Sequence, residues 1–202
     1  REIRAYAPLV THGYGYSTSV RNIVTTEDDY FRPIDPCIAP DGSLYVIDWH
    51  NVLIGHMQHN ARDPLRDHVH GRVYRITYPS RPLVTPPQVA GASVSTLLDN
   101  LKLPELRARY RSRRALRGHP ASEVLPAVKA WVASLNKSDP QYEHNVLEAL
   151  WTTWGLNAAD DALLRQMLNA KDFHARAAAV RVLRYNTHRT PDYAALLEKA
   201  AA

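Results

Sequence analysis

Four prolines lie within nine residues near the middle of the chain: Pro79, Pro82, Pro86 and Pro87. Proline fixes φ and lacks an amide hydrogen, so this density disfavours both a helix and an inner strand. We therefore predict a linker over residues 81–92. Residues 1–80 carry eight arginines, no lysine and nine acidic residues, whereas residues 81–202 carry seventeen Lys or Arg and eleven acidic residues. This change in composition predicts two domains of different architecture.

Residues 1–80 have the pattern of a β-structure. A Pro-Asp-Gly turn signal at residues 40–42 separates the predicted strands Ile34–Ala39 and Ser43–Asp48. The segments Asn22–Thr26 and Arg72–Tyr78 are also predicted strands, and the latter alternates along its length. About three or four strands cannot close a stable core by themselves. We therefore predict that residues 1–80 do not fold alone, and that the chain is a segment of a longer protein.

Residues 93–202 have the pattern of an all-α domain. Apolar residues recur at helical spacing in seven segments: Val94–Leu101, Pro104–Arg117, Ser122–Leu135, Gln141–Trp154, Ala159–Ala170, Phe173–Tyr185 and Asp192–Ala201. Short amphipathic helices joined by brief turns predict an antiparallel pairwise stack, that is, an α-solenoid. Asp172, with small residues after it, fits a helix of a HEAT-type repeat, in which the aspartate caps the helix. We expect Trp131, Trp151 and Trp154 to pack in the core.

A long polar loop over residues 51–71 holds the first group of candidate site residues. Imidazoles and carboxylates bind divalent metals, and histidine moves protons near neutral pH. The hypotheses are catalysis by His56 and His59, and a metal site formed by Asp63, Asp67, His68 and His70. The alternative is a rigid loop held by its own Asp–Arg and Asp–His hydrogen bonds. The spacing matches no standard zinc motif.

A second group of candidates lies at the ends of the predicted strands. Pairing across the 40–42 turn would bring Asp35 and Asp48 to the same end of the hairpin, where Arg32 could approach them. We interpret this end as a ligand-binding site formed by Arg32, Asp35, Asp48, His50 and Arg72. The alternative is a structural Arg–Asp pair that ties strand edges together.

Other features exclude several classes of function. The six arginines between residues 107 and 117 spread around a helix, which favours solvated faces and salt bridges over a nucleic-acid interface. No apolar run approaches the roughly 20 residues of a membrane span. The single cysteine, Cys37, excludes an internal disulfide, a cysteine zinc cluster and a CxxCH haem site within this chain. We expect its thiol to be buried and inert.

The chain resembles a known family at three places: Phe31–Asp35, Ala39–Asn51 and the loop His56–Arg72. These segments are similar to the end of the propeller in PVC-type haem-binding proteins, also termed membrane-bound dehydrogenases, of planctomycetes and verrucomicrobia. Helical segments such as Glu143–Trp151 also resemble the family, and the similarity covers roughly residues 28–190. The family's propeller is similar to those of sorbosone and quinoprotein glucose dehydrogenases.

The resemblance implies an α+β protein in two domains: part of a β-propeller over residues 1–80 and a HEAT-like solenoid over residues 93–202. It implies a periplasmic or secreted protein that oxidises a sugar or alcohol and passes electrons to haem c on a C-terminal domain. A quinone and a divalent cation such as calcium are the cofactors it suggests. We expect this segment alone to be inactive. The alternative is a non-catalytic scaffold that binds carbohydrate or, through the solenoid, a protein partner.

Overall fold

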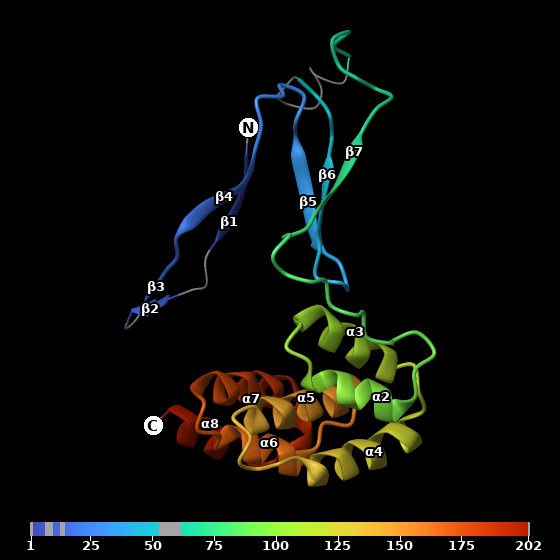
Figure 1. The fold of residues 1–202 in the computed structure, drawn as a ribbon. Coiled ribbons are helices and arrows are strands. Elements are labelled where there is room, and N and C mark those ends of the chain that lie inside the picture. Colours follow the sequence, from blue (N-terminus) through green and yellow to red (C-terminus); the bar gives the residue numbers. More distant parts are fainter. Residues whose placement is uncertain (1, 7–9, 13–14, 53–61, 202) are drawn as a thin grey trace. The chain divides into compact units, whose positions relative to one another are not determined.

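The computed structural model describes residues 2–6, 10–12, 15–52 and 62–201 (Figure 1). The chain contains both strands and helices. It divides into two compact units, Arg1–Pro86, termed the strand unit, and Pro87–Ala202, termed the helical unit. Among the described residues, no helix has the length and apolar character needed to cross a membrane.

The strand unit begins with a hairpin whose two arms each contain two short strands. In its first arm are β1 (Glu2–Tyr6) and β2 (Val10–His12), and in its second arm are β3 (Gly15–Ser17) and β4 (Val20–Thr25). The inner strands pair with each other and the outer strands pair with each other, all antiparallel. The sequence predicted only the last of them, because the other three are short and lack a clear apolar alternation.

A three-stranded antiparallel sheet follows, in the order β5 (Pro33–Ile38), β6 (Leu44–Asp48) and β7 (Arg72–Ile76). All three strands were predicted, each with slightly different ends. The turn between β5 and β6 forms as its residues predict: Gly42 has a φ of 83° and donates its amide to the carbonyl of Ala39 over 2.9 Å. A bulge at Asp35, with a φ of 45°, interrupts the β5–β6 pairing.

The two faces of this sheet differ in burial. Val46 is 1% exposed, and its cross-strand neighbours are Pro36 and Tyr74. On the opposite face a cross-strand row formed by Ile34, Ile47 and Val73 stays largely exposed. In the described part of the strand unit, the buried apolar side chains are those of Phe31 and Val46. This unit therefore has very little core of its own.

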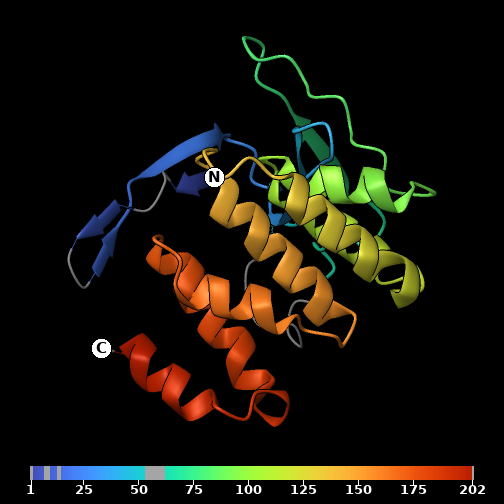
Figure 2. The same ribbon diagram turned by 90° about the horizontal axis from the view of Figure 1, so that it is seen from below.

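The helical unit contains all the described helices. Their bounds are α2 (Val94–Asp99), the 3-10 helix η1 (Asn100–Lys102), α3 (Leu106–Leu116), α4 (Ala121–Ser134), α5 (Tyr142–Gly155), α6 (Asp161–Leu168), α7 (Phe173–Tyr185), the 3-10 helix η2 (Thr187–Arg189) and α8 (Tyr193–Ala201). Helices that follow one another in sequence pack side by side from α4 through α8 (Figure 2). The sequence predicted every α-helix, with ends that differ by up to two residues.

The core of the helical unit is built from the apolar stripes that the spacing predicted. Leu97, Leu116, Val146, Leu150 and Leu183 are fully buried within one cluster. Trp131 is buried in that cluster, and Trp151 and Trp154 pack against it. The prediction that these tryptophans are core residues is confirmed.

Two helix starts show how side chains set the ends of helices. We predicted that α3 begins at Pro104, but it begins at Leu106. The carboxylate of Glu105 accepts the amides of Arg107 and Ala108, which fixes Glu105 as the cap. Asp172 caps α7 as predicted, because its carboxylate accepts the amide of His174 over 3.0 Å.

Two arginines of the run form salt bridges, as predicted, and their partner is a buried carboxylate. Glu148 on α5 has a side chain that is 1% exposed, and the guanidinium groups of Arg109 and Arg113 on α3 both contact it. Arg109 Nε donates to Glu148 Oε1 over 3.1 Å, and His144 Nε2 lies 3.4 Å from the same oxygen. These two arginines therefore join α3 to α5 inside the unit instead of pointing into solvent.

Candidate functional site

Asp48, at the end of β6, is the centre of a polar cluster in the strand unit. Its side chain is 0% exposed. One carboxylate oxygen accepts the backbone amides of Arg32 over 2.7 Å and His50 over 2.9 Å. The other accepts Nε of Arg72 over 2.7 Å. A buried charge is tolerated only when it is paired and hydrogen-bonded, and Asp48 meets both conditions.

Arg72, at the start of β7, joins two carboxylates. Besides Asp48, it donates from Nη1 to Asp28 Oδ2 over 2.7 Å. The hydrogen bond from Arg72, followed by one from the amide of Tyr30, holds the pKa of Asp28 below its usual value. Asp28 was not singled out in the sequence, since nothing in its Glu-Asp-Asp context marks one acid as the partner of an arginine 44 residues away.

Arg32 approaches Asp48 through its backbone, not through its guanidinium group. The guanidinium donates to the carbonyl oxygens of Asp29 and Phe31 over 3.0 and 2.9 Å, and to that of Val52 over 2.6 Å. Arg32 therefore fixes the chain around the end of β6. Asp35 occupies the exposed bulge position of β5 and has no described bond to this cluster.

His50 occupies a constrained position directly after β6. Its φ of 52° lies in the left-handed region, which few residues other than glycine adopt. Its ring stacks on Tyr30 with centroids 4.9 Å apart, and its Nε2 lies 3.6 Å from Asp67 Oδ2. The hydrogen bond from the His50 amide to Asp48 and the stacking of the His50 ring on Tyr30 hold the backbone in this conformation.

Asp67 and His70 form the best-defined ionisable pair of the long loop. Asp67 Oδ2 lies 2.8 Å from His70 Nδ1, and Asp67 Oδ1 accepts the amides of Val69 and His70, each over 2.9 Å. The two hydrogen bonds from the backbone amides hold the pKa of Asp67 well below its usual range, and the hydrogen bond with the His70 ring adds to this effect. This Asp–His hydrogen bond is of the kind that the rigid-loop alternative predicts.

The other predicted loop residues take different roles or lie outside the described part. Asp63 closes a turn, because its carboxylate accepts the amide of Leu65 over 2.9 Å, and it has no hydrogen bond to a described histidine. His68 is exposed. His56 and His59, the predicted catalytic pair, lie outside the described residues.

The metal hypothesis finds no assembled ligand set in the described part of the chain. There, no three side chains of His, Cys, Asp or Glu come together in an arrangement suited to a metal ion. His50, Asp67 and His70 are close to one another, but the centroids of the two rings are 6.4 Å apart and the carboxylate between them is hydrogen-bonded to His70. Metal binding by Asp63, Asp67, His68 and His70 stays a prediction.

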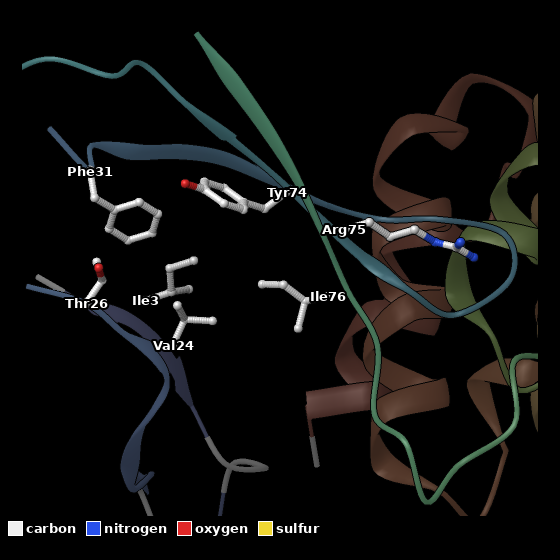
Figure 3. Close-up of a pocket in the computed structure, with 7 residues that line it drawn as sticks. All are labelled: Ile3, Val24, Thr26, Phe31, Tyr74, Arg75 and Ile76. Atoms are coloured by element: carbon white, nitrogen blue, oxygen red, sulfur yellow. The ribbon is translucent and has the colours of Figure 1, made fainter. Parts of the chain in front are cut away.

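A small apolar pocket lies beside the polar cluster (Figure 3). The T-shaped pair of Phe31 and Tyr74 forms one wall, with ring centroids 5.7 Å apart, and the guanidinium of Arg72 lies 5.6 Å from the centroid of the Tyr74 ring. The volume is about 160 Å³, and the residues that line it are Ile3, Val24, Thr26, Phe31, Tyr74, Arg75 and Ile76. Figure 3 shows Arg75 extending away from the other side chains.

The small pocket of the strand unit does not fit a quinone cofactor. Sites for ligands of that size have volumes of roughly 300–1,000 Å³, which exceeds this pocket. Quinone binding stays a prediction.

Comparison with known proteins gives one match. Residues 7–80 match a domain of unknown function (DUF7133). The matched span contains the whole cluster around Asp48 and the Asp67–His70 pair. No curated protein and no solved structure matches the chain.

Proposed function

We propose that the strand unit contributes an acid–base histidine, His70, to an oxidoreductase-like protein that oxidises a sugar or alcohol. The observation that carries this proposal is the hydrogen bond between Asp67 and His70 Nδ1. A carboxylate that accepts from one ring nitrogen fixes the tautomer and leaves the other nitrogen as a base. The side chain of His70 is 73% exposed, so its Nε2 is accessible to a substrate.

The proposed chemistry of this unit is the proton-accepting half of the oxidation. In neutral His70, the Nδ1–H group donates a hydrogen bond to the Asp67 carboxylate, and Nε2 takes the proton of the substrate hydroxyl group. The imidazolium that forms is stabilised by the Asp67 carboxylate, which stays ionised because its pKa is low. The group that accepts the hydride would be bound by parts of the protein other than the described residues, and no step is assigned to it.

The wider assignment rests on the family resemblance. We propose a periplasmic or secreted protein in which the strand unit is the end of a β-propeller and the helical unit is a HEAT-like solenoid. Electron transfer to haem c would take place on a separate domain. The successive packing of α4 to α8 and the small core of the strand unit support this architecture.

The test compares two histidine variants in the complete protein that contains this chain. His70→Asn is expected to reduce turnover of aldoses or primary alcohols, with a dye as electron acceptor, by about 100-fold or more, as removal of a general base does. His174→Asn on α7 changes an exposed histidine that also has an aspartate partner, Asp172, and is expected to leave turnover unchanged. Equal turnover in the wild type and His70→Asn would overturn the proposal.

A second measurement tests the hydrogen bond itself in the 202-residue chain. Nitrogen-15 NMR of the His70 ring should find the hydrogen on Nδ1 in the wild type. Asp67→Asn should shift the population towards the Nε2–H tautomer. A ring that is Nε2–H in the wild type would remove the geometric basis of the proposal.

A non-catalytic scaffold is the second candidate function, and a specific observation favours it. Asp48, Arg72 and Arg32 satisfy one another or the backbone, as expected of a structural cluster. In that case the Asp67–His70 pair would only brace the loop, and the complete protein would bind carbohydrate or a protein without turnover.

A further inference from the structure

The helical unit carries a groove that the proposed function does not use. A hollow of about 560 Å³ lies between α3 and the turn Val89–Ala92 that precedes α2. The turn holds Gly91 with a φ of 67°, closed by a hydrogen bond from the amide of Ala92 to the carbonyl of Val89 over 3.3 Å. A side-chain carbon added at Gly91 would meet nothing within 4 Å, so this wall of the groove is open.

The opposite wall of the groove is cationic. Arg111 and Arg114 on α3 line it, together with His119 just after the helix, and no acidic residue lines it. Arg107 lies one turn before Arg111 on the same face, because positions four apart on a helix are neighbours. Helices α2 and α3 pack together, so the turn and the arginines belong to one packed assembly (Figure 1).

These arginines differ from those that structure the unit. Arg109 and Arg113 are neutralised by Glu148, and Arg165 is paired with Asp161 and Asp192. Among the described residues, no carboxylate lies within ion-pair distance of Arg107, Arg111 or Arg114, and all three are exposed. Over residues 87–202, sixteen Lys or Arg stand against eleven acidic residues, so the helical unit has a net positive charge.

The remaining surface of the groove is apolar and small. Val89, Ala92 and Ala115 contribute to it. A ligand that matches both walls presents carboxylates to the arginines and no bulky group to the apolar surface. An extended peptide presents alternate residues to the same side, about 6.6 Å apart at roughly 3.3 Å per residue. Two acidic residues at alternate positions can therefore reach Arg111 and Arg114 at the same time, while the residue between them faces away.

We propose that this groove binds an acidic peptide segment of a partner protein, with its carboxylates on Arg111 and Arg114. Guanidinium groups bind carboxylates through two parallel hydrogen bonds. This geometry makes the contact specific in orientation, in addition to the attraction between opposite charges. A nucleic acid is disfavoured, because a duplex interface usually needs six to ten or so phosphate contacts along a stripe. Arg117, the next arginine of α3, turns towards Gly155 instead of extending the stripe.

The test uses a fluorescent peptide of alternating Glu and Ala, titrated with the full 202-residue chain by fluorescence anisotropy. A peptide with Gln in place of Glu serves as the neutral probe. The expected result is saturable binding of the Glu peptide, at least tenfold weaker binding of the Gln peptide, and weaker binding at higher salt. Equal affinity for the two peptides, or no binding of the Glu peptide, would overturn the proposal.

Matched variants separate this site from the general positive charge. Arg111→Glu/Arg114→Glu should weaken binding of the Glu peptide at least tenfold. Arg181→Glu/Arg184→Glu on α7 makes the same change in charge at the same helical spacing and should have little effect. The pairs are well matched, since Arg114 lies over the ring of Tyr110 and Arg184 over that of Tyr185. Arg111→Gln/Arg114→Gln repeats the test with a smaller perturbation, and circular dichroism checks that each variant keeps its helices.

Two other outcomes would also reject the proposal. Equal losses in the two Glu double variants would show that net charge alone attracts the peptide. Tighter binding of a single-stranded oligonucleotide of equal charge, lost in Arg111→Glu/Arg114→Glu, would assign the groove to nucleic acid. Neither result depends on the oxidoreductase proposal, because that proposal concerns residues of the strand unit.

Discussion

Glu148 shows what a single residue contributes inside the helical unit. Burial by itself raises the pKa of its carboxyl group, but the adjacent His144 ring and the Arg113 guanidinium outweigh burial, and the pKa lies below its usual value. The carboxylate is therefore ionised at neutral pH and neutralises two arginines from another helix. Removing one member of such a cluster leaves the others buried and uncompensated.

Replacement of this residue gives the first prediction. Glu148→Gln keeps the shape of the side chain and removes its charge, and should lower the free energy of unfolding by about 3–5 kcal/mol. Urea unfolding followed by tryptophan fluorescence measures the change, because Trp131, Trp151 and Trp154 all lie in or against this core. The control is Glu198→Gln on the exposed side of α8, which should change stability by less than about 0.5 kcal/mol. A similar small change for Glu148→Gln would contradict the prediction.

Residue pairing was the part of the structure that the sequence predicted least well. The arginine run was predicted to form solvated faces and salt bridges, but its partner was not identified, because the acid that neutralises Arg109 and Arg113 is 35 or more residues away in sequence. Asp–His hydrogen bonds within the long loop were one of the alternatives, and Asp67 and His70, only three residues apart, form one. Local pairs follow from spacing, whereas distant pairs depend on how elements pack.

The β5–β6 hairpin is an element whose stability should depend on pH. The Ser43 hydroxyl and the Ser43 amide donate to Asp41 over 2.6 and 2.9 Å. These two hydrogen bonds, assisted by Arg75, lower the pKa of Asp41 from 3.8 to about 2. A carboxylate whose pKa is lower in the folded state stabilises the fold above its unfolded pKa, and this contribution is lost as pH falls through the folded value.

We therefore expect the hairpin to lose this stabilisation between about pH 4 and pH 2. Asp41→Asn should be less stable at neutral pH and should change less across that range. The amide resonance of Ser43, followed by NMR during acid titration, reports on the turn directly. Asp35→Asn, at the exposed bulge of the same hairpin, should keep the wild-type profile. Identical profiles for Asp41→Asn and the wild type would show that this carboxylate does not support the turn.

The N-cap of α6 gives a prediction for a helix. Asp160 accepts the amide of Leu163 over 2.9 Å. Asp160→Ala should lower the free energy of unfolding by about 1 kcal/mol, since the amide then has no side-chain acceptor. Asp160→Asn, which keeps an acceptor oxygen, should restore most of the loss. Urea unfolding of both variants measures the difference, and an Ala variant as stable as the wild type would reject the cap.

Helices were predicted well where the apolar periodicity extends over many residues, and their ends were predicted poorly where a capping side chain determines them. The apolar spacing of α5 and α7 was sufficient to find these helices. The predicted start of α3 at Pro104 was wrong by two residues, because Glu105 caps the helix and Leu106 begins it. The strands β1 to β3 were missed because they lack the clear apolar alternation that marked β6 and β7.

At the scale of the whole molecule, the two units differ sharply in the size of their hydrophobic cores. Nearly all the buried apolar side chains of the described chain belong to the helical unit, whereas Phe31 and Val46 represent the strand unit. The cluster around Asp48 ties strand ends together, but polar contacts of this kind do not replace a hydrophobic core. The two units should therefore behave differently when separated.

We expect residues 87–202 expressed alone to keep their helices and to unfold cooperatively. Residues 1–86 alone should show no cooperative transition, because too little apolar surface is buried. Far-UV circular dichroism with thermal and urea unfolding of both segments measures this. A cooperative transition in residues 1–86 would mean that the strand unit is a stable domain, and an unfolded 87–202 segment would mean that the helical unit needs the strands.

The single cysteine gives this molecule a built-in reporter. Cys37 is half-buried rather than buried as we expected, and it pairs across the sheet with Tyr45, on the same face as the exposed row of Ile34, Ile47 and Val73. Since the chain has one thiol, a reagent or fluorophore attaches there and nowhere else. The rate of its modification then measures whether anything covers this face of the sheet. A thiol that reacts readily in the 202-residue chain and is protected in the complete protein would show that other parts of the protein pack on these strands.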